Sequence, residues 1–236
     1  MKIIKKLNIN YWLRKVYTSN LYQIFFSNND LKKKVFTSIY KSNHWAQFDN
    51  LPGEIVSVSG PGSNVNQKGF LDLKKNFENI FKKYEIRSIL DMPCGDFLWL
   101  NEVIKDKNIY YLGIDIVNEL ISRNNIKYKN EKTNFECRDI VEFFPIRQFD
   151  LILIRDLFIH LKNSDITKIL NNLKSMNFKY LAVNSNTIEI NKDVNIGQHR
   201  KINLLIKPFN LKEPMFSIND GEADKFIYFY KKEDLI

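Results

Sequence analysis

One stretch near the middle of the chain limits the possible folds most strongly. The apolar run 88–90 ends in Asp91, turns sharply at 92–96, and continues into a segment with helical spacing of apolar residues at 97–104. A strand, a tight turn and a helix N-terminus bring backbone N–H groups and a positive dipole end to the edge of an open α/β sheet. Asp115 ends a second apolar run twenty residues after Gly95, where a carboxylate can accept both hydroxyls of a ribose. We therefore expect a nucleotide-like ligand at this edge.

The rest of the chain after residue 69 alternates between strand and helix patterns. Near-continuous apolar strands are predicted at 86–91, 109–115, 133–138, 149–155 and 180–184, and helices at 70–84, 97–105, 117–127 and 163–175. Such strands between helices indicate a parallel sheet covered on both faces. The strand at 225–231 has no helix after it, so we expect it to be antiparallel. The predicted fold is α/β, a Rossmann-like doubly wound, mostly parallel seven-stranded sheet with an antiparallel C-terminal strand.

The first 69 residues have a different pattern. Apolar residues at helical spacing predict one or two helices over 8–41, with lysines on the other side. We favour a helical extension packed on the main domain, over contact with a membrane surface or dimerisation. Residues 42–69 are typical of a loop, whose segment 59–63 (Ser-Gly-Pro-Gly-Ser) can turn sharply and approach a ligand closely. We expect residues 1–69 to form an extension that acts as a lid or pocket edge, and residues 70–236 to form the main domain.

Composition excludes several classes of protein. The net charge of the 236 residues is +9, but the lysines are scattered and arginine clusters are absent, so nucleic acid is a disfavoured partner. Cys94 and Cys137 belong to no CxxC pair, which predicts neither a metal site nor a disulfide. A basic N-terminus without a following apolar run is not a signal peptide, and no run of about 20 apolar residues exists. We expect a cytoplasmic protein; the pattern leaves peripheral membrane contact open and does not set the oligomeric state.

These motifs together resemble the class I S-adenosylmethionine-dependent methyltransferases over about residues 70–236. That family has Asp-x-Gly-x-Gly-x-Gly after its first strand, whereas residues 91–97 here retain only the middle glycine, Gly95, and carry Pro93 and Phe97. The resemblance implies that Asp115 binds the ribose, that Asp139 binds the adenine amino group, and that the segment ending in Asp156 faces the methyl group. It implies S-adenosyl-L-methionine as cofactor and S-adenosyl-L-homocysteine as product. The residues implied to bind the cofactor are Asp91, Pro93, Gly95, Asp96, Trp99, Asp115, Ile116, Asp139, Ile140 and Arg155.

A narrower resemblance covers nearly the whole chain. Residues 44–45, 59–63, 91–96, 155–160, 197–204 and 208–209 resemble a bacterial group of small methyltransferases that is often associated with capsular or other surface polysaccharides. Members of that group methylate sugar hydroxyls or phosphoramidate decorations. The resemblance implies a small-molecule or nucleotide-activated sugar as acceptor. The residues predicted to bind the acceptor are Trp45, Ser59, Gly60, Ser63, His199 and Arg200.

The chemistry requires a group that takes a proton from the acceptor. A sugar hydroxyl is a weak nucleophile at neutral pH, and a general base accelerates its reaction by ~10²–10⁴-fold. His160 lies four residues after Asp156, so one helical turn would bring the carboxylate to the imidazole and raise its basicity. We predict His160 as the base, with Asp156 as its partner or as the base itself. Arg200 is a candidate to bind an anionic group of the acceptor.

Two other functions fit parts of the pattern. The basic charge favours a nucleic-acid methyltransferase, but residues 155–158 (Arg-Asp-Leu-Phe) lack the Asn/Asp-Pro-Pro-Tyr/Phe sequence of amino-methylating members, which leaves ribose methylation as the alternative. The replacement of family glycines at Pro93 and Phe97 favours a binding or scaffold protein that has the fold without turnover.

Overall fold

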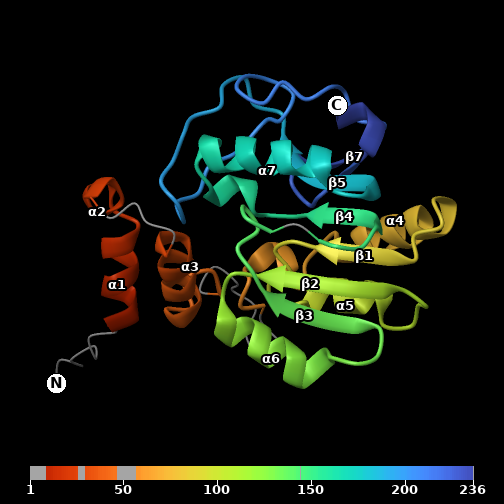
Figure 1. Cartoon of the computed structure of the whole chain (residues 1–236), viewed down its shortest axis with the longest axis horizontal. Helices are drawn as coiled ribbons and strands as arrows, with labels where there is room; N and C mark the ends of the chain where they lie inside the picture. The colour runs from red at the N-terminus through yellow and green to blue at the C-terminus, as the bar shows by residue number, and fades with distance from the viewer. Residues whose placement is uncertain (1–8, 26–29, 47–56, 144, 236) are drawn as a thin grey trace.

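The computed structural model describes residues 9–25, 30–46, 57–143 and 145–235, and it contains one seven-stranded sheet (Figure 1). The order of the strands across the sheet is β3-β2-β1-β4-β5-β7-β6. Five strands pair in parallel, β7 runs antiparallel to both of its neighbours, and the predicted doubly wound fold is confirmed. The bounds of the strands are Ser88–Asp91 (β1), Tyr110–Asp115 (β2), Thr133–Cys137 (β3), Phe149–Ile154 (β4), Phe178–Asn186 (β5), Phe216–Asn219 (β6) and Lys225–Lys231 (β7).

Helices cover both faces of the sheet, and each face has its own core. One core contains Phe77 of α4 and Leu100 of α5, and the other contains Ile166 of α7 and Val35 of α3. The parallel strands β1 and β4 are buried along nearly their whole length, as strands covered on both faces must be. The bounds of these helices are Leu31–Lys41 (α3), Phe70–Lys83 (α4), Leu98–Ile104 (α5), Asn118–Tyr128 (α6) and Asn163–Ser175 (α7).

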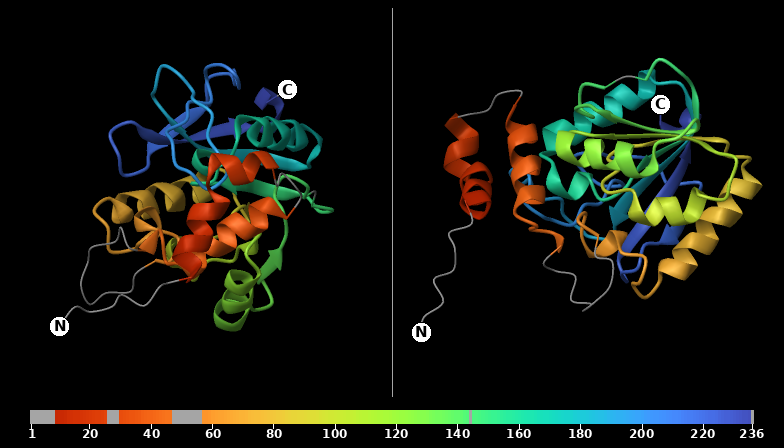
Figure 2. Two further views of the ribbon diagram at one scale, coloured as in Figure 1. Left: turned by 90° about the vertical axis from the view of Figure 1, so that its left-hand side faces the viewer. Right: turned by 90° about the horizontal axis from the view of Figure 1, so that it is seen from below.

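The helices of the N-terminal extension pack on the main domain to different extents. α3 does pack there, because Leu31, Val35 and Ile39 are buried in the core beside α7. α1 (Ile9–Tyr17) buries no residue, and α2 (Asn20–Phe25) exposes Leu21 and Ile24. Figure 2 shows α1 and α2 on the outside of α3, away from the sheet. The structure thus separates a packed helix from an exposed helical pair, while residues 47–56 of the predicted loop lie outside the described residues.

Candidate functional site

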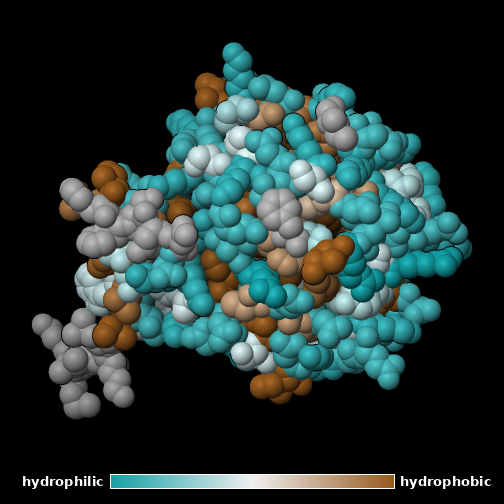
Figure 3. Space-filling view, in the orientation of Figure 1, coloured by the Kyte–Doolittle hydropathy of each residue, from teal (hydrophilic) through white to brown (hydrophobic). Residues whose placement is uncertain are grey.

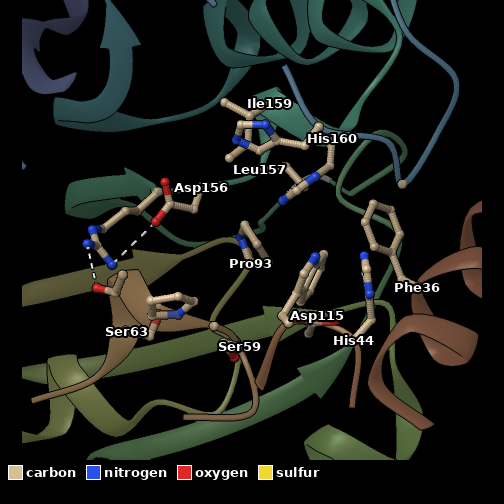
Figure 4. Close-up of a pocket in the computed structure, with 18 of the residues that line it drawn as sticks. Phe36, His44, Ser59, Ser63, Pro93, Asp115, Asp156, Leu157, Ile159 and His160 are labelled. Atoms are coloured by element: carbon tan, nitrogen blue, oxygen red, sulfur yellow. Dashed lines mark hydrogen bonds and ion pairs between the residues drawn. The ribbon is translucent and has the colours of Figure 1, made fainter. Parts of the chain in front are cut away.

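A cavity of about 730 Å³ lies at the edge where β1, β2, β4 and β5 end. The carboxyl ends of parallel strands meet at this edge, so side chains far apart in sequence come together there. Residues of α1, α3 and the 59–63 segment complete its walls (Figure 4). The predicted site residues that line the cavity are Trp45, Ser59, Gly60, Ser63, Asp91, Pro93, Gly95, Trp99, Asp115, Ile116, Ile140, Arg155, Asp156, His160 and His199.

The turn after β1 keeps its shape despite the missing glycines. Phe97 adopts a left-handed φ of 60°, and its buried ring packs on Tyr111 at 4.3 Å between centroids, away from the cavity. The Cys94 amide donates to the Ile114 carbonyl at 2.9 Å, which joins the turn to β2. Gly113 permits this approach, because a Cβ there would lie 2.8 Å from the Cys94 Cβ. Phe97 therefore supports the turn from behind and does not close the pocket.

Two buried carboxyl groups lie at the ends of β1 and β2, where few interactions offset the free-energy cost of burying their charge. Burial raises the pKa of Asp91 to about 8, although the Tyr111 hydroxyl donates to its Oδ2 at 2.8 Å. Burial also raises the pKa of Asp115 to about 6, against hydrogen bonds from backbone amides such as that of Val117, 3.0 Å from Oδ1. Neither carboxylate forms an ion pair within the part of the chain that the structure describes. A ligand that brings hydrogen-bond donors and positive charge would complete this side of the cavity.

The 57–59 segment is fixed to the β1 turn by Asp96. The Asp96 carboxylate accepts hydrogen bonds from the Ser57 hydroxyl at 2.7 Å and the Val58 amide at 2.8 Å, while its own amide donates to Ser59 Oγ at 2.9 Å. The Tyr40 hydroxyl of α3 lies 3.1 Å from the same Ser59 oxygen. Asp96, predicted to bind the cofactor, lies outside the cavity lining and acts by holding Ser59 at its edge.

A buried charge network forms the opposite side, after β4. The Arg155 guanidinium donates to Asp220 Oδ1 at 2.7 Å and to the Gly62 carbonyl at 2.8 Å, and it stacks over the Trp99 ring at 4.8 Å. Lys225 Nζ lies 2.7 Å from Asp156 Oδ1 and 3.1 Å from Asp220 Oδ2. Burial alone would raise the pKa of Asp156, but Lys225 and Arg155 outweigh it and hold that pKa well below its usual range. This side has its charges paired within the protein.

His160 projects into the cavity above Pro93 (Figure 4). Its Nδ1 lies 3.0 Å from the Gln198 carbonyl, so Nδ1 carries the proton and Nε2 keeps its lone pair. Trp45 stacks on the ring at 4.9 Å between centroids and 29° between planes. Burial lowers the pKa of His160 to about 4, which keeps the imidazole neutral at pH 7. The predicted hydrogen bond with Asp156 is replaced by the Gln198 carbonyl, because Asp156 turns toward Lys225.

Two further predicted residues lie outside the cavity lining. Asp139 accepts a hydrogen bond from the Val141 amide at 3.0 Å and pairs with Lys32 at 3.3 Å. Arg200 donates to the carbonyls of Lys192 and Phe158 and to the Asn163 side chain. These hydrogen bonds occupy its guanidinium and hold the segment after β5 against the turn that carries His160. The structure therefore gives Arg200 a structural role in place of the predicted contact with the acceptor.

The structure adds cavity residues that the sequence pattern did not single out. Tyr40 of α3 and Lys225 of β7 line the cavity, as does Asp220 after β6. Tyr40 falls on the apolar face of its helix, where the pattern indicates only core packing. Asp220 follows β6, a short strand that we did not predict, and Lys225 begins the predicted strand β7. No sequence signal marks the contact of Asp220 with Arg155 or of Lys225 with Asp156, because both contacts depend on the β6–β7 turn.

Comparison with known proteins indicates a methyltransferase domain. The family described as a methyltransferase domain matches residues 89–177, from β1 to the end of α7. The N-methyltransferase NodS from Bradyrhizobium japonicum WM9, in complex with S-adenosyl-L-homocysteine, aligns with a TM-score of 0.55 and 13% identity over 82% of this chain and 97% of that one. Magnesium protoporphyrin IX methyltransferase from Synechocystis PCC 6803 aligns at 0.58 and 11% identity, over 85% and 99% of the two chains. Residues 89–177 thus match a methyltransferase domain, and the described chain shares the fold of these two methyltransferases.

One sequence relative gives no assignment. A stretch of 163 residues is 27% identical to a protein named trigger factor from Ehrlichia canis (strain Jake) and covers 67% of this chain. The chain spans only about a third, 36%, of that relative's length. The methyltransferase assignment therefore rests on the domain match, the fold and the cavity.

The residues of the cavity fit S-adenosylmethionine. Its ribose hydroxyls would add donors to the backbone amides that Asp115 accepts from, and its ammonium would place positive charge beside Asp91. Among the described residues, no cluster of three His, Cys, Asp or Glu is arranged to hold a metal ion. No described helix is both long and apolar enough to cross a bilayer.

Proposed function

We propose that this methyltransferase is an O-methyltransferase whose acceptor is a sugar hydroxyl, or a phosphoramidate or phosphorylated decoration, in the biosynthesis of capsular or surface polysaccharide. The observation that carries the proposal is the neutral imidazole of His160, which presents a free Nε2 to the cavity because Nδ1 is held by Gln198. A neutral base suits an acceptor that must lose a proton, as a hydroxyl does. The resemblance to the polysaccharide-associated group supplies the class of acceptor, a small or nucleotide-activated sugar.

The cofactor, when bound, supplies a methyl group already activated on its sulfonium. Asp115 would hold its ribose, and Asp91 with the Gly95 turn would hold its amino-acid portion. The Val117 amide orients Asp115 and the Tyr111 hydroxyl orients Asp91, so their orientation costs little when the ligand arrives.

His160 would act on the acceptor in a single displacement. Asp115 and Asp91 would hold the cofactor while it supplies the methyl group to the acceptor oxygen, with the neutral thioether as the leaving group. The hydroxyl proton moves to His160 Nε2. The Gln198 carbonyl then stabilises the imidazolium through the Nδ1–H bond, and the nearby Asp156 carboxylate favours the same positive charge.

The N-terminal residues would form one wall of the acceptor site. We assign Trp45, Ser59, Gly60, Ser63 and His199 to acceptor binding, since all of them line the cavity. Trp45 also shields His160 from water by stacking on it. In this view residues 1–69 are an edge of the pocket, with α3 fixed to the cofactor side through Tyr40 and Ser59.

The test is a methyl-transfer assay on a panel of nucleotide-activated sugars and phosphorylated sugars, with S-adenosyl-L-homocysteine formation as readout. We expect His160→Gln to lower kcat by ~10²–10⁴-fold, because a glutamine amide cannot accept the proton. Affinity for S-adenosyl-L-homocysteine, measured by calorimetry on the same variant, should stay within about twofold of the wild type. Full activity in His160→Gln would contradict the assigned base, and turnover on RNA ribose but on no sugar would contradict the acceptor class.

A further inference from the structure

The helical pair α1–α2 exposes an apolar face that the fold does not use. Ile9, Trp12 and Val16 follow helical spacing on α1 and are 69%, 52% and 47% exposed, and Ile24 of α2 is 72% exposed. Figure 3 shows apolar side chains gathered at this end of the molecule, over α1 and α2. Burying such side chains stabilises an assembly by ~25 cal/mol per Å² of apolar surface, so a face of this kind indicates an interaction surface.

The described residues of α1 and α2 carry charge of a single sign. Residues 9–25 contain Arg14 and Lys15 and no acidic residue. Within α1, Lys15 Nζ lies 4.8 Å from the centre of the Tyr11 ring and 5.6 Å from that of Trp12. A short helix with basic and aromatic residues beside an apolar face is typical of segments that lie in the interface of a bilayer.

The pair is held in place by the main domain. The Gln23 side chain makes two hydrogen bonds to the Ile196 backbone, at 2.9 Å to its carbonyl and 3.0 Å from its amide. The Gln198 side chain donates to the Thr18 carbonyl at 3.3 Å. These polar contacts anchor the corner between α1 and α2 to the main domain, while the apolar side chains of the pair stay exposed.

We propose that the α1–α2 pair binds the surface of an anionic lipid bilayer, with the apolar face in the interface and the basic residues at the headgroups. Charge favours this occupant over a second copy of the chain. A two-fold dimer through the same face would bring Lys15 of one copy near that of the other, and like charges oppose such contact. Anionic headgroups attract the same residues, at about a fivefold gain in binding per Lys or Arg.

The placement of this surface has a consequence for the catalytic cavity. Arg14 and Thr18 of α1 line the cavity, and Gln198, which contacts Thr18, also holds His160. A bilayer beneath α1 would therefore border the cavity mouth and present acceptors carried at the lipid surface. This inference goes beyond the proposed function, since lipid binding is independent of the acceptor's identity.

The test is co-sedimentation of the full chain with vesicles of neutral phosphatidylcholine, and of the same lipid with phosphatidylglycerol added. We expect binding to the anionic vesicles only, weakening as NaCl rises from 0.05 to 0.5 M because salt screens the charges. Ile9→Asn with Val16→Asn should weaken binding by about tenfold or more. Lys15→Glu should weaken it by about 20-fold at low salt.

Matched controls distinguish binding through this surface from nonspecific binding through any exposed apolar residue. Leu71→Asn with Ile126→Asn changes two apolar residues of α4 and α6 that are 77% and 88% exposed, and should leave vesicle binding unchanged. Affinity for S-adenosyl-L-homocysteine should be unchanged in all these variants, which verifies that they fold. Equal binding by the α1 and control variants, or no binding to anionic vesicles, would overturn the proposal. Analytical ultracentrifugation gives another outcome that would overturn the proposal. A dimer of the wild type that becomes a monomer in Ile9→Asn with Val16→Asn would show that a second copy of the chain covers the apolar face.

Discussion

The two sides of the cavity treat their carboxylates in opposite ways. On the side of β1 and β2, burial raises the pKa values of Asp91 and Asp115 to about 8 and about 6, and no ion pair with a described residue offsets it. On the side of β4, Lys225 and Arg155 hold the pKa of Asp156 well below its usual range, and the Asp156 side chain is 27% exposed. The difference in pKa therefore follows from the two cations beside Asp156 and from its lesser burial.

This difference in charge pairing indicates which side of the cavity is suited to bind a charged ligand. The β4 side is complete without one, because two cations and two carboxylates neutralise each other there. Neither carboxylate of the β1–β2 side forms an ion pair with a described residue, and S-adenosylmethionine carries positive charge. In the proposed function, the unpaired carboxylates lie where the cofactor would bind and the paired network lies where the acceptor would be positioned.

The largest expected effect comes from breaking the paired side. Asp220→Asn leaves Arg155 and Lys225 with one carboxylate fewer at a buried position, so we expect a loss of about 3–5 kcal/mol in the free energy of unfolding. Urea denaturation followed by circular dichroism measures it. A change below about 1 kcal/mol would mean that the network is not a structural unit. The exposed pair Lys168–Glu142 is the control, since Glu142→Gln should cost little.

The next effect is on the unpaired side. Asp115→Ala removes the acceptor of both ribose hydroxyls, and hydrogen bonds to a charged group contribute about 1.5–3 kcal/mol each. We expect calorimetry to show at least a hundredfold loss of affinity for S-adenosyl-L-homocysteine. Asp139→Ala sharpens the comparison, because Asp139 lies outside the cavity lining and its loss should change affinity by less than about threefold. Equal losses of affinity in Asp115→Ala and Asp139→Ala would contradict the proposed cofactor site.

The smallest expected effect is a gain in stability from Asp115→Asn, opposite in sign to the loss expected from Asp220→Asn. The folded pKa of Asp115, about 6, exceeds its unfolded value near 3.8, so the folded state binds more protons between these values. The ligand-free protein should therefore lose stability as pH rises from about 4 to about 6, by about 2–3 kcal/mol from this group. Asp115→Asn removes that part of the pH dependence, so the variant should be more stable than the wild type at pH 7. A less stable variant with an unchanged pH profile would show that the charge is not the cause.

The sequence predicted most of the fold, because the elements that form the sheet follow local rules. Apolar strands of four to nine residues between amphipathic helices indicated β1–β5 and β7 with boundaries close to those observed. β6 was missed because its burial alternates between half-buried and exposed, a weak signal over four residues. The exposure of α1 was also missed, because an amphipathic pattern predicts an apolar face without saying what covers it.

The candidate site was predictable where it follows from chain order and not where it depends on contacts across the fold. Asp91 and Asp115 lie at strand ends and Gly95 lies in the turn after β1, and all three line the cavity as expected. Arg200 looked available to a ligand, but it is bonded to carbonyls that only the folded chain brings near. The partner of His160 is a backbone carbonyl of Gln198, and no side-chain motif can reveal such a partner.

The central claim, that the cofactor side lacks positive charge until the ligand binds, can be tested by counting protons. At pH 7 an Asp91 with a pKa of about 8 is roughly 90% protonated, and an ammonium placed beside it lowers that pKa. Calorimetric titration of S-adenosyl-L-homocysteine in buffers of different ionisation enthalpy gives the number of protons released. We predict release of close to one proton per ligand in the wild type and almost none in Asp91→Asn. Binding by the wild type without proton release would contradict the claim.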